Sequence, residues 1–273
     1  MLGASIQFLA SIAMPISYVG LLYVFDKDGT DRNDPKSVRL RFIAACVSSA
    51  ASLILTYILL FPWDPHPLRT MGIHLDGSFA AVLIPSFLIF LIYAGHLLIM
   101  YYDQLLDSYL DINQWKYSFS QITWIRDAIV APATEEITFR GCAATLMASA
   151  LQSQWLAILL SPLAFSVSHF HHIGDDQRKG ATLNQAIAKR VFQMLYTYLF
   201  GAYATYLHQS TGHILAPIVT HSLCNSLGIP MVSEIQTFPD AETRKKLWLT
   251  FTFGAICFVL LVGPLTHKSL YSS

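Results

Sequence analysis

Two adjacent carboxylates, Glu135 and Glu136, stand in an apolar stretch of the sequence together with the guanidinium of Arg140. Ionisable groups inside a membrane helix are costly to bury, which makes them candidates for function. Glu136 and Arg140 are four residues apart, in the acid-before-base order that favours an intrahelical ion pair. Glu135 is rotated by about 100° from Glu136 around a helix, so its carboxylate faces another side. We expect Glu135 to act as a general base on water and the other two residues to pair.

A histidine ends a second apolar stretch, in the pattern Phe165-x-x-x-His169. The four-residue spacing places these two side chains on one face of a helix. His171 and His172 follow in a polar run that we interpret as a loop, so either could be mistaken for the functional residue. Since a histidine at the end of a membrane helix is more often interfacial than catalytic, the position of His169 leaves both interpretations open.

A third pattern, His221-x-x-x-Asn225, lies inside another apolar stretch. The spacing puts both side chains on one helix face, where both can donate hydrogen bonds to one oxygen atom. Two donors aimed at one point form an oxyanion hole, which stabilises the negative charge of a tetrahedral intermediate. Hydrogen bonding between neighbouring membrane helices is the alternative use of such a pair.

The composition indicates that membrane helices position these residues. Of the 273 residues, 54% are hydrophobic and 12% are charged, whereas about a quarter of the residues in soluble domains are charged. The mean hydropathy is +0.47. The net charge is zero and no basic cluster is interleaved with aromatic residues, so nucleic acid is not an expected partner. We predict an all-α integral membrane protein, a polytopic helical bundle whose surroundings are the lipid bilayer.

Eight apolar stretches are long enough, or nearly so, to cross a bilayer. Four are almost free of charge and cover about residues 6–25, 42–61, 79–101 and 248–265. Four more are interrupted by acidic, basic, His or Asn residues and cover about 122–149, 155–168, 191–207 and 214–229. We therefore predict about eight transmembrane helices in a single membrane domain, residues 1–273, whose catalytic core is about residues 122–229.

The positions of the basic residues predict the orientation of the bundle. With eight helices, almost all of the lysines and arginines fall in loops on one side of the membrane, and only Arg69 and Lys268 fall in loops on the other. Cytosolic loops carry the excess of basic residues. Both termini are thus expected to face away from the cytosol. Glu135, His169 and His221 then lie in the cytosolic half of the bilayer, in a cavity open to the cytosol.

Taken in chain order, these three patterns resemble the motifs of the CAAX protease and bacteriocin-processing superfamily. The sequence around Glu135 and the phenylalanine before Arg140 resemble especially its eukaryotic branch, the Ras-converting CAAX endopeptidases. The resemblance implies a protease of the endoplasmic reticulum membrane that removes the C-terminal tripeptide (-AAX) from prenylated CAAX proteins, such as Ras-type small GTPases. The roles that it implies are water activation by Glu135 with His169, oxyanion stabilisation by His221 and Asn225, and support by Glu136, Arg140 and Phe165.

Two other functions remain possible from the residues alone. Glu135, His169 and His221 could bind zinc as a His₂Glu set, although the His-Glu-x-x-His signature of many zinc proteases is absent. A non-enzymatic scaffold or a transporter could use the same charges as a proton relay or an ion path. The resemblance favours a glutamate-type peptidase, for which we predict neither a cofactor nor a bound metal.

Overall fold

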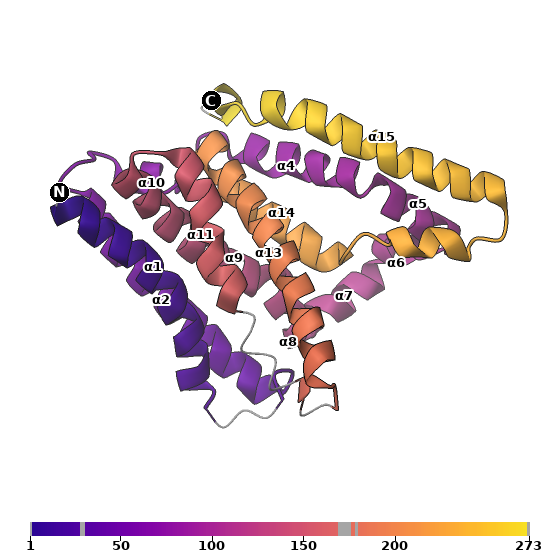
Figure 1. The fold of residues 1–273 in the computed structure, drawn as a ribbon, viewed down its shortest axis with the longest axis horizontal. Coiled ribbons are helices and arrows are strands. Elements are labelled where there is room, and N and C mark those ends of the chain that lie inside the picture. The colour runs from indigo at the N-terminus through magenta and orange to yellow at the C-terminus, as the bar shows by residue number, and fades with distance from the viewer. Residues whose placement is uncertain (1, 28–30, 169–175, 178–179, 272–273) are drawn as a thin grey trace.

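A computed structural model of the chain describes residues 2–27, 31–168, 176–177 and 180–271. Throughout this part of the chain the secondary structure consists of helices and the turns between them, without a strand (Figure 1). The prediction of an all-α fold is therefore confirmed. Lipid offers the backbone no hydrogen-bond partners, so a membrane chain satisfies its own backbone groups within helices.

The first two helices form an antiparallel pair. α1 covers Leu2–Phe25 and α2 covers Pro35–Leu60, and they lie side by side on one flank of the molecule (Figure 1). Both are long apolar runs. The start of α2 is fixed by Asp34, whose side chain accepts hydrogen bonds from the backbone N–H groups of Lys36 and Ser37, and by the proline at its first position.

The segment that carries the paired glutamates runs as one helical path of varying width. It comprises α8 (Ile122–Ile125), a π-helical stretch (Arg126–Val130), α9 (Ala131–Glu136), a second π-helical stretch (Ile137–Ala144) and α10 (Thr145–Leu151). π-helical turns are uncommon and are found frequently at functional sites. Both glutamates stand at the end of α9, directly before the second π-helical stretch.

Besides α1 and α2, three further helices pack against the segment of the paired glutamates. They are α11 (Gln154–Ser168), α13 (Leu183–Thr211) and α14 (Leu215–Leu227). α11 packs along α13, and Gly201 lies at a close approach between the two. A Cβ atom at Gly201 would lie 2.8 Å from Cβ of Pro162 and 3.1 Å from Nη2 of Arg140. A glycine at this position therefore lets α13 press against the arginine of the first motif.

The remaining helices form a second flank. α4 (Ser78–Ile92) and α5 (Ala94–Tyr102) meet at a bend of 67°, and α15 (Ala241–Leu265) packs along both (Figure 1). The short helices are α3 (Pro67–Thr70), α6 (Asp107–Leu110), α7 (Ile112–Ser120) and the 3₁₀ turns Val232–Thr237 and Lys268–Tyr271.

The described chain contains four helices long and apolar enough to cross a membrane, or five if the bent pair α4–α5 is one span. The four are α1, α2, α15 and the segment that begins with α14. A multi-pass membrane bundle is therefore confirmed, whereas the predicted count of eight spans is not. The other predicted spans coincide with helices that are short, interrupted by π-helical turns or polar at one end. Neighbouring helices shield such segments from lipid, so they need less apolar length than an isolated span.

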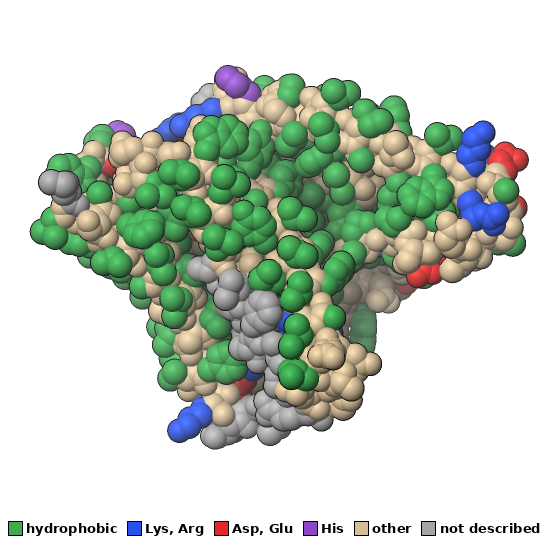
Figure 2. Space-filling view, in the orientation of Figure 1, with side chains coloured by type: hydrophobic (Ala, Val, Ile, Leu, Met, Phe, Trp, Pro, Cys, Tyr) green, Lys and Arg blue, Asp and Glu red, His purple; other side chains and the backbone are tan. Residues whose placement is uncertain are grey.

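The surface has the character of a lipid-facing protein. Figure 2 shows hydrophobic side chains spread over most of one face, with the charged groups gathered at its margins. Large apolar side chains on the outer faces of α1, α13 and α15 are exposed, among them Ile16, Leu199 and Val259. A soluble monomer rarely exposes apolar area on this scale, so the pattern agrees with a surface covered by lipid.

Candidate active site

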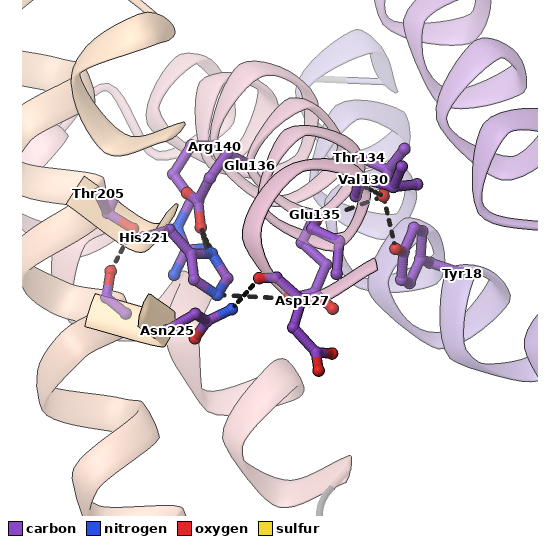
Figure 3. Close-up of polar contacts among 12 residues, drawn as sticks. Tyr18, Asp127, Val130, Thr134, Glu135, Glu136, Arg140, Thr205, His221 and Asn225 are labelled. Atoms are coloured by element: carbon purple, nitrogen blue, oxygen red, sulfur yellow. Dashed lines mark hydrogen bonds and ion pairs between the residues drawn. The ribbon is translucent and has the colours of Figure 1, made fainter. Parts of the chain in front are cut away.

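Glu136 is the centre of a buried hydrogen-bond network. Its Oε1 atom accepts a hydrogen bond from Nη1 of Arg140 at 2.7 Å and another from Nδ1 of His221 at 2.7 Å (Figure 3). The Glu136 side chain is completely buried, and the Arg140 side chain is 2% exposed. The structure thus forms the ion pair that the four-residue spacing predicts. It adds a histidine that the spacing could not reveal.

The contact with Glu136 fixes the orientation of the His221 ring. Because Nδ1 donates its hydrogen to the carboxylate, Nε2 is the nitrogen left for other partners. Nε2 lies 3.9 Å from Oε2 of Glu135, too far for a direct hydrogen bond but suited to a bridging water. The ring of Phe200 packs on the other side, with its centroid 5.0 Å from that of His221.

Glu135 faces a different side of α9 from the buried network, as the rotation of one residue requires. Its side chain is 19% exposed and lines a cavity of about 710 Å³. His221 and Asn225 line the same cavity, so one carboxylate, one imidazole and one amide share a single chamber. A general base together with hydrogen-bond donors is the equipment for the hydrolysis of a peptide bond.

α14 is joined to the first π-helical stretch by two side chains. Nδ2 of Asn225 donates to the carbonyl oxygen of Asp127 at 2.9 Å, and Oγ of Ser222 donates to that of Ala128 at 2.5 Å. An amide carries two N–H bonds, so Asn225 keeps a second donor after the first is used. The bond to Asp127 therefore positions Asn225 at the cavity without consuming its capacity to donate.

α1 forms the opposite wall of the cavity and is tied to α9. The hydroxyl of Tyr18 lies 2.9 Å from Oγ1 of Thr134, which in turn donates to the carbonyl oxygen of Val130 at 2.7 Å (Figure 3). The ring of Tyr18 packs edge-on against Phe139, with centroids 5.3 Å apart. These contacts hold the helix of the paired glutamates against the N-terminal helix.

The structure brings most of the predicted site residues together. Glu135, His221 and Asn225 line one cavity, and Glu136 and Arg140 form the support behind it. The predicted catalytic His169 lies outside the described residues. The predicted supporting Phe165 belongs to α11, but its side chain is not among those described.

The sequence did not reveal two features of the site, one contact and one part of the cavity wall. The bond between Glu136 and His221 joins residues 85 positions apart, for which no local spacing exists. The cavity wall formed by Tyr18 and Arg32 was missed because tyrosines are common in apolar segments and arginines are common in loops. The only available signal was the adjacency of the two glutamates, which implies that one of them has a partner elsewhere in the fold.

Comparison with known proteins gives a consistent result. Residues 118–227 match the family described as type II CAAX prenyl endopeptidase Rce1-like. CAAX prenyl protease 2 of Caenorhabditis elegans is 42% identical over 254 residues, which is 93% of this chain and 95% of the relative. The proteins of the same name from Homo sapiens and Arabidopsis thaliana are 32% and 30% identical, each over 98% of this chain and over 83% and 92% of their own lengths. No solved structure matches the chain significantly.

Proposed function

Because the chain belongs to the family of Rce1-like type II CAAX prenyl endopeptidases, we propose that it removes the C-terminal tripeptide of prenylated CAAX proteins in the Glu135 cavity. The observation that carries this assignment to particular residues is the convergence of Glu135, His221 and Asn225 on one cavity, with His221 held by the buried Glu136. Ras-type small GTPases are the substrates that we propose.

The reaction begins with the activation of water by Glu135. The carboxylate accepts a proton from a water molecule, whose oxygen attacks the carbonyl carbon of the peptide bond that follows the prenylated cysteine. His169 assists this step, as the family resemblance implies. Collapse of the tetrahedral intermediate breaks the C–N bond, and Glu135 returns the proton to the amine of the departing tripeptide. No group other than water is consumed.

Stabilisation of the oxyanion falls to Asn225 and His221. The free N–H of the Asn225 amide donates to the developing negative charge. Nε2 of His221 can donate only when the ring is protonated, because its Nδ1 hydrogen is already bound to Glu136. The bond to the buried carboxylate of Glu136 fixes the ring with Nε2 on the side of the cavity and Glu135. The second glutamate of the motif thus orients one member of the proposed donor pair.

The walls of the cavity suit a substrate that carries a prenyl group. Apolar and aromatic side chains from two flanking helices line it: Val19 and Leu22 from α1, and Phe192 and Phe200 from α13. A hydrocarbon chain gains roughly 25 cal/mol for each Å² of apolar surface removed from water. An apolar chamber around a polar catalytic group can therefore bind the lipid and expose the neighbouring peptide bond.

We further propose a catalytic core of about residues 122–229, with the cavity open to the cytosol and the protein placed in the endoplasmic reticulum membrane. The charge distribution supports the orientation, because Arg32, Arg41 and Lys189 gather at the cavity and basic residues mark cytosolic loops. Relatives in animals and plants support a eukaryotic membrane system.

We propose catalysis without a metal. The alternative is a zinc site formed by Glu135, His169 and His221, in which the metal would activate the water. Exhaustive chelation decides between the two, because a zinc enzyme loses activity on chelation and recovers it when zinc is added.

The test of the function uses purified protein in neutral detergent with a farnesylated CAAX peptide and its unprenylated twin. We expect release of the tripeptide from the prenylated peptide alone, unaffected by chelator and lost in Glu135→Ala. Cleavage abolished by chelator would assign the activity to a zinc enzyme. Cleavage of neither peptide by the wild type would reject the protease and favour a scaffold or a transporter.

A further inference from the structure

Among the described residues, three basic side chains line the active-site cavity: Arg32, Arg41 and Lys189. Two of them are neutralised by aspartates. Arg41 forms an ion pair with Asp26 at 2.6 Å, and Lys189 forms one with Asp176 at 2.9 Å. These two cations therefore have their partners already.

The pKa directions of the two aspartates agree with this pairing. Burial by itself would raise the pKa of Asp26, but hydrogen bonds from Ser37 and Arg41 and the charge of Arg41 hold it below its usual value. A hydrogen bond from Lys189 lowers the pKa of Asp176. Burial opposes this shift, and a hydrogen bond from Arg190 adds to it. Both carboxylates stay ionised at neutral pH and keep their partners occupied.

Arg32 is the cation that differs. It lies in the connection between α1 and α2, and the described residues include none that forms an ion pair or a side-chain hydrogen bond with it. Its backbone carbonyl accepts a hydrogen bond from Nη1 of Arg126 at 2.8 Å, which holds the connection beside the cavity. Arg126 also grips both carboxylate oxygens of Asp127, at 2.7 and 3.0 Å, so this acid at the cavity is engaged.

The surroundings of Arg32 favour an added negative charge. The Arg32 side chain reaches solvent, but desolvation by the surrounding protein and the positive charge of Arg126 lower its pKa below the ordinary arginine value. The charge of Asp127 opposes this shift in part, and the charge of Arg41 adds to the repulsion. An anion placed against the Arg32 guanidinium would relieve this repulsion. The cavity thus combines an ionisable base at Glu135 with a cation, Arg32, that has no ion-pair partner among the described residues.

We propose that Arg32 binds the α-carboxylate at the C-terminus of the substrate. This inference rests on the proposed function, since that substrate brings one anion into the cavity in a fixed place, three residues beyond the bond to be cut. An extended tripeptide spans about 10 Å. A guanidinium holds a carboxylate through two parallel hydrogen bonds. Binding at Arg32 would measure the cleavage point from the end of the chain and so set the length of the released peptide.

The experiment compares two prenylated peptides that differ only at the C-terminus, one a free acid and one an amide. Cleavage is measured in neutral detergent without anionic lipid, which removes phospholipid headgroups as competing anions. We expect the wild type to prefer the acid about tenfold in kcat/KM, through KM, as one charge-assisted interaction implies. In Arg32→Gln the preference should fall to near unity, and Arg32→Lys should restore part of it.

Arg39→Gln is the matched control. Arg39 is an exposed arginine on α2, seven residues along the same part of the chain, and it does not line the cavity. Its removal changes the net charge equally, so the preference for the acid should stay at the wild-type value. A loss of preference in both variants would show that the preference for the acid depends on the net charge of the protein, and it would overturn the assignment to Arg32.

Failure of this inference differs from failure of the proposed function. A wild type that cleaves acid and amide equally is still the protease, but it does not recognise the carboxylate. A wild type that cleaves neither peptide rejects both proposals. If Arg32→Gln does not fold, inhibition of the wild type by the free product tripeptide answers the same question. The acid should inhibit about tenfold better than its amide, and equal inhibition would overturn the proposal.

Discussion

Two groups of histidines in this molecule use the same side chain in opposite ways. His221, at the middle of α14, gives one nitrogen to the carboxylate of Glu136 and turns the other toward the cavity and Glu135. The second group, which we name the histidine clamp, comprises His74, His208 and His213 before the start of α14. Nε2 of each has a partner there: the carbonyl of Gly212 for His74, that of Met71 for His208 and the hydroxyl of Ser78 for His213.

The two groups of histidines differ in their hydrogen-bond partners and in whether they line the active-site cavity. The clamp joins backbone segments, and none of its members lines the active-site cavity. His208 and His213 are 2% and 1% exposed. Such histidines stabilise packing, whereas a histidine oriented by a carboxylate with a free nitrogen facing a cavity can carry out chemistry. Substitutions at the Glu135 site should therefore reduce turnover, and substitutions at the clamp should reduce stability.

The largest effect is expected for Glu135→Gln. The amide keeps the size of the side chain but cannot accept the proton of water, so kcat should fall about 10³-fold, within the range for removal of a general base. Because Glu135 has no direct hydrogen bond to His221, the thermal unfolding temperature in detergent should not change. Turnover of the prenylated peptide and a melting curve on the same sample test both parts. Activity within tenfold of the wild type would remove Glu135 from the catalytic role.

Glu136→Gln should reduce both stability and turnover, because we propose that Glu136 both pairs with Arg140 and orients His221. Removal of its charge leaves Arg140 as an unpaired buried cation, and breaking a buried pair in this way costs about 3–5 kcal/mol of unfolding free energy. The double variant Glu136→Gln/Arg140→Met removes the stranded charge as well. We expect it to recover much of the unfolding temperature but not the turnover rate, since His221 still lacks its carboxylate. Recovery of both would show that Glu136 acts on packing alone.

Parts of the fold could be predicted from sequence because lipid leaves few alternatives. Apolar runs such as those of α1 and α15 have to form helices in a bilayer, and they do. The number of spans could not be predicted in the same way. Residues 122–151 are shielded by neighbouring helices, so their apolar length says little about their path. The widening of this path into π-helical turns leaves no periodic signature in the sequence.

In the site, too, contacts within one helix could be predicted from the sequence, whereas contacts between helices could not. The Glu136–Arg140 pair could be predicted because four residues of helix bring both side chains onto one face. The contact between Glu136 and His221 depends on how α14 packs against α9, which no spacing encodes. The assignment of Glu136 as merely the partner of Arg140 was therefore incomplete. The role of His169 stays a prediction.

Gly72→Ala tests the clamp from its backbone side. Gly72 has a φ angle of +77°, and a Cβ atom there would lie 2.8 Å from the backbone nitrogen of Ile214 and 2.9 Å from Nε2 of His208. The resulting strain should cost about 1–3 kcal/mol of stability, while the folded fraction turns over substrate at the wild-type rate. Gly263→Ala in α15 meets no atom within 4 Å and is the matched control, expected to be neutral or slightly stabilising. A fall in kcat beyond threefold for Gly72→Ala would link the clamp to catalysis.

Tyr18→Phe gives the smallest effect and the sharpest test of the comparison, because Tyr18 lines the active-site cavity yet has its polar atom engaged like those of the clamp. The substitution removes the hydrogen bond between the hydroxyl and Oγ1 of Thr134, which keeps its own bond to the carbonyl of Val130. No buried group is left without a partner, so the cost should be about 1 kcal/mol of unfolding free energy. Packing against Phe139 is retained, and kcat should change by less than threefold. A hundredfold slower turnover without loss of stability would place the Tyr18 hydroxyl in the catalytic machinery and show that an occupied polar atom does not exclude a chemical role.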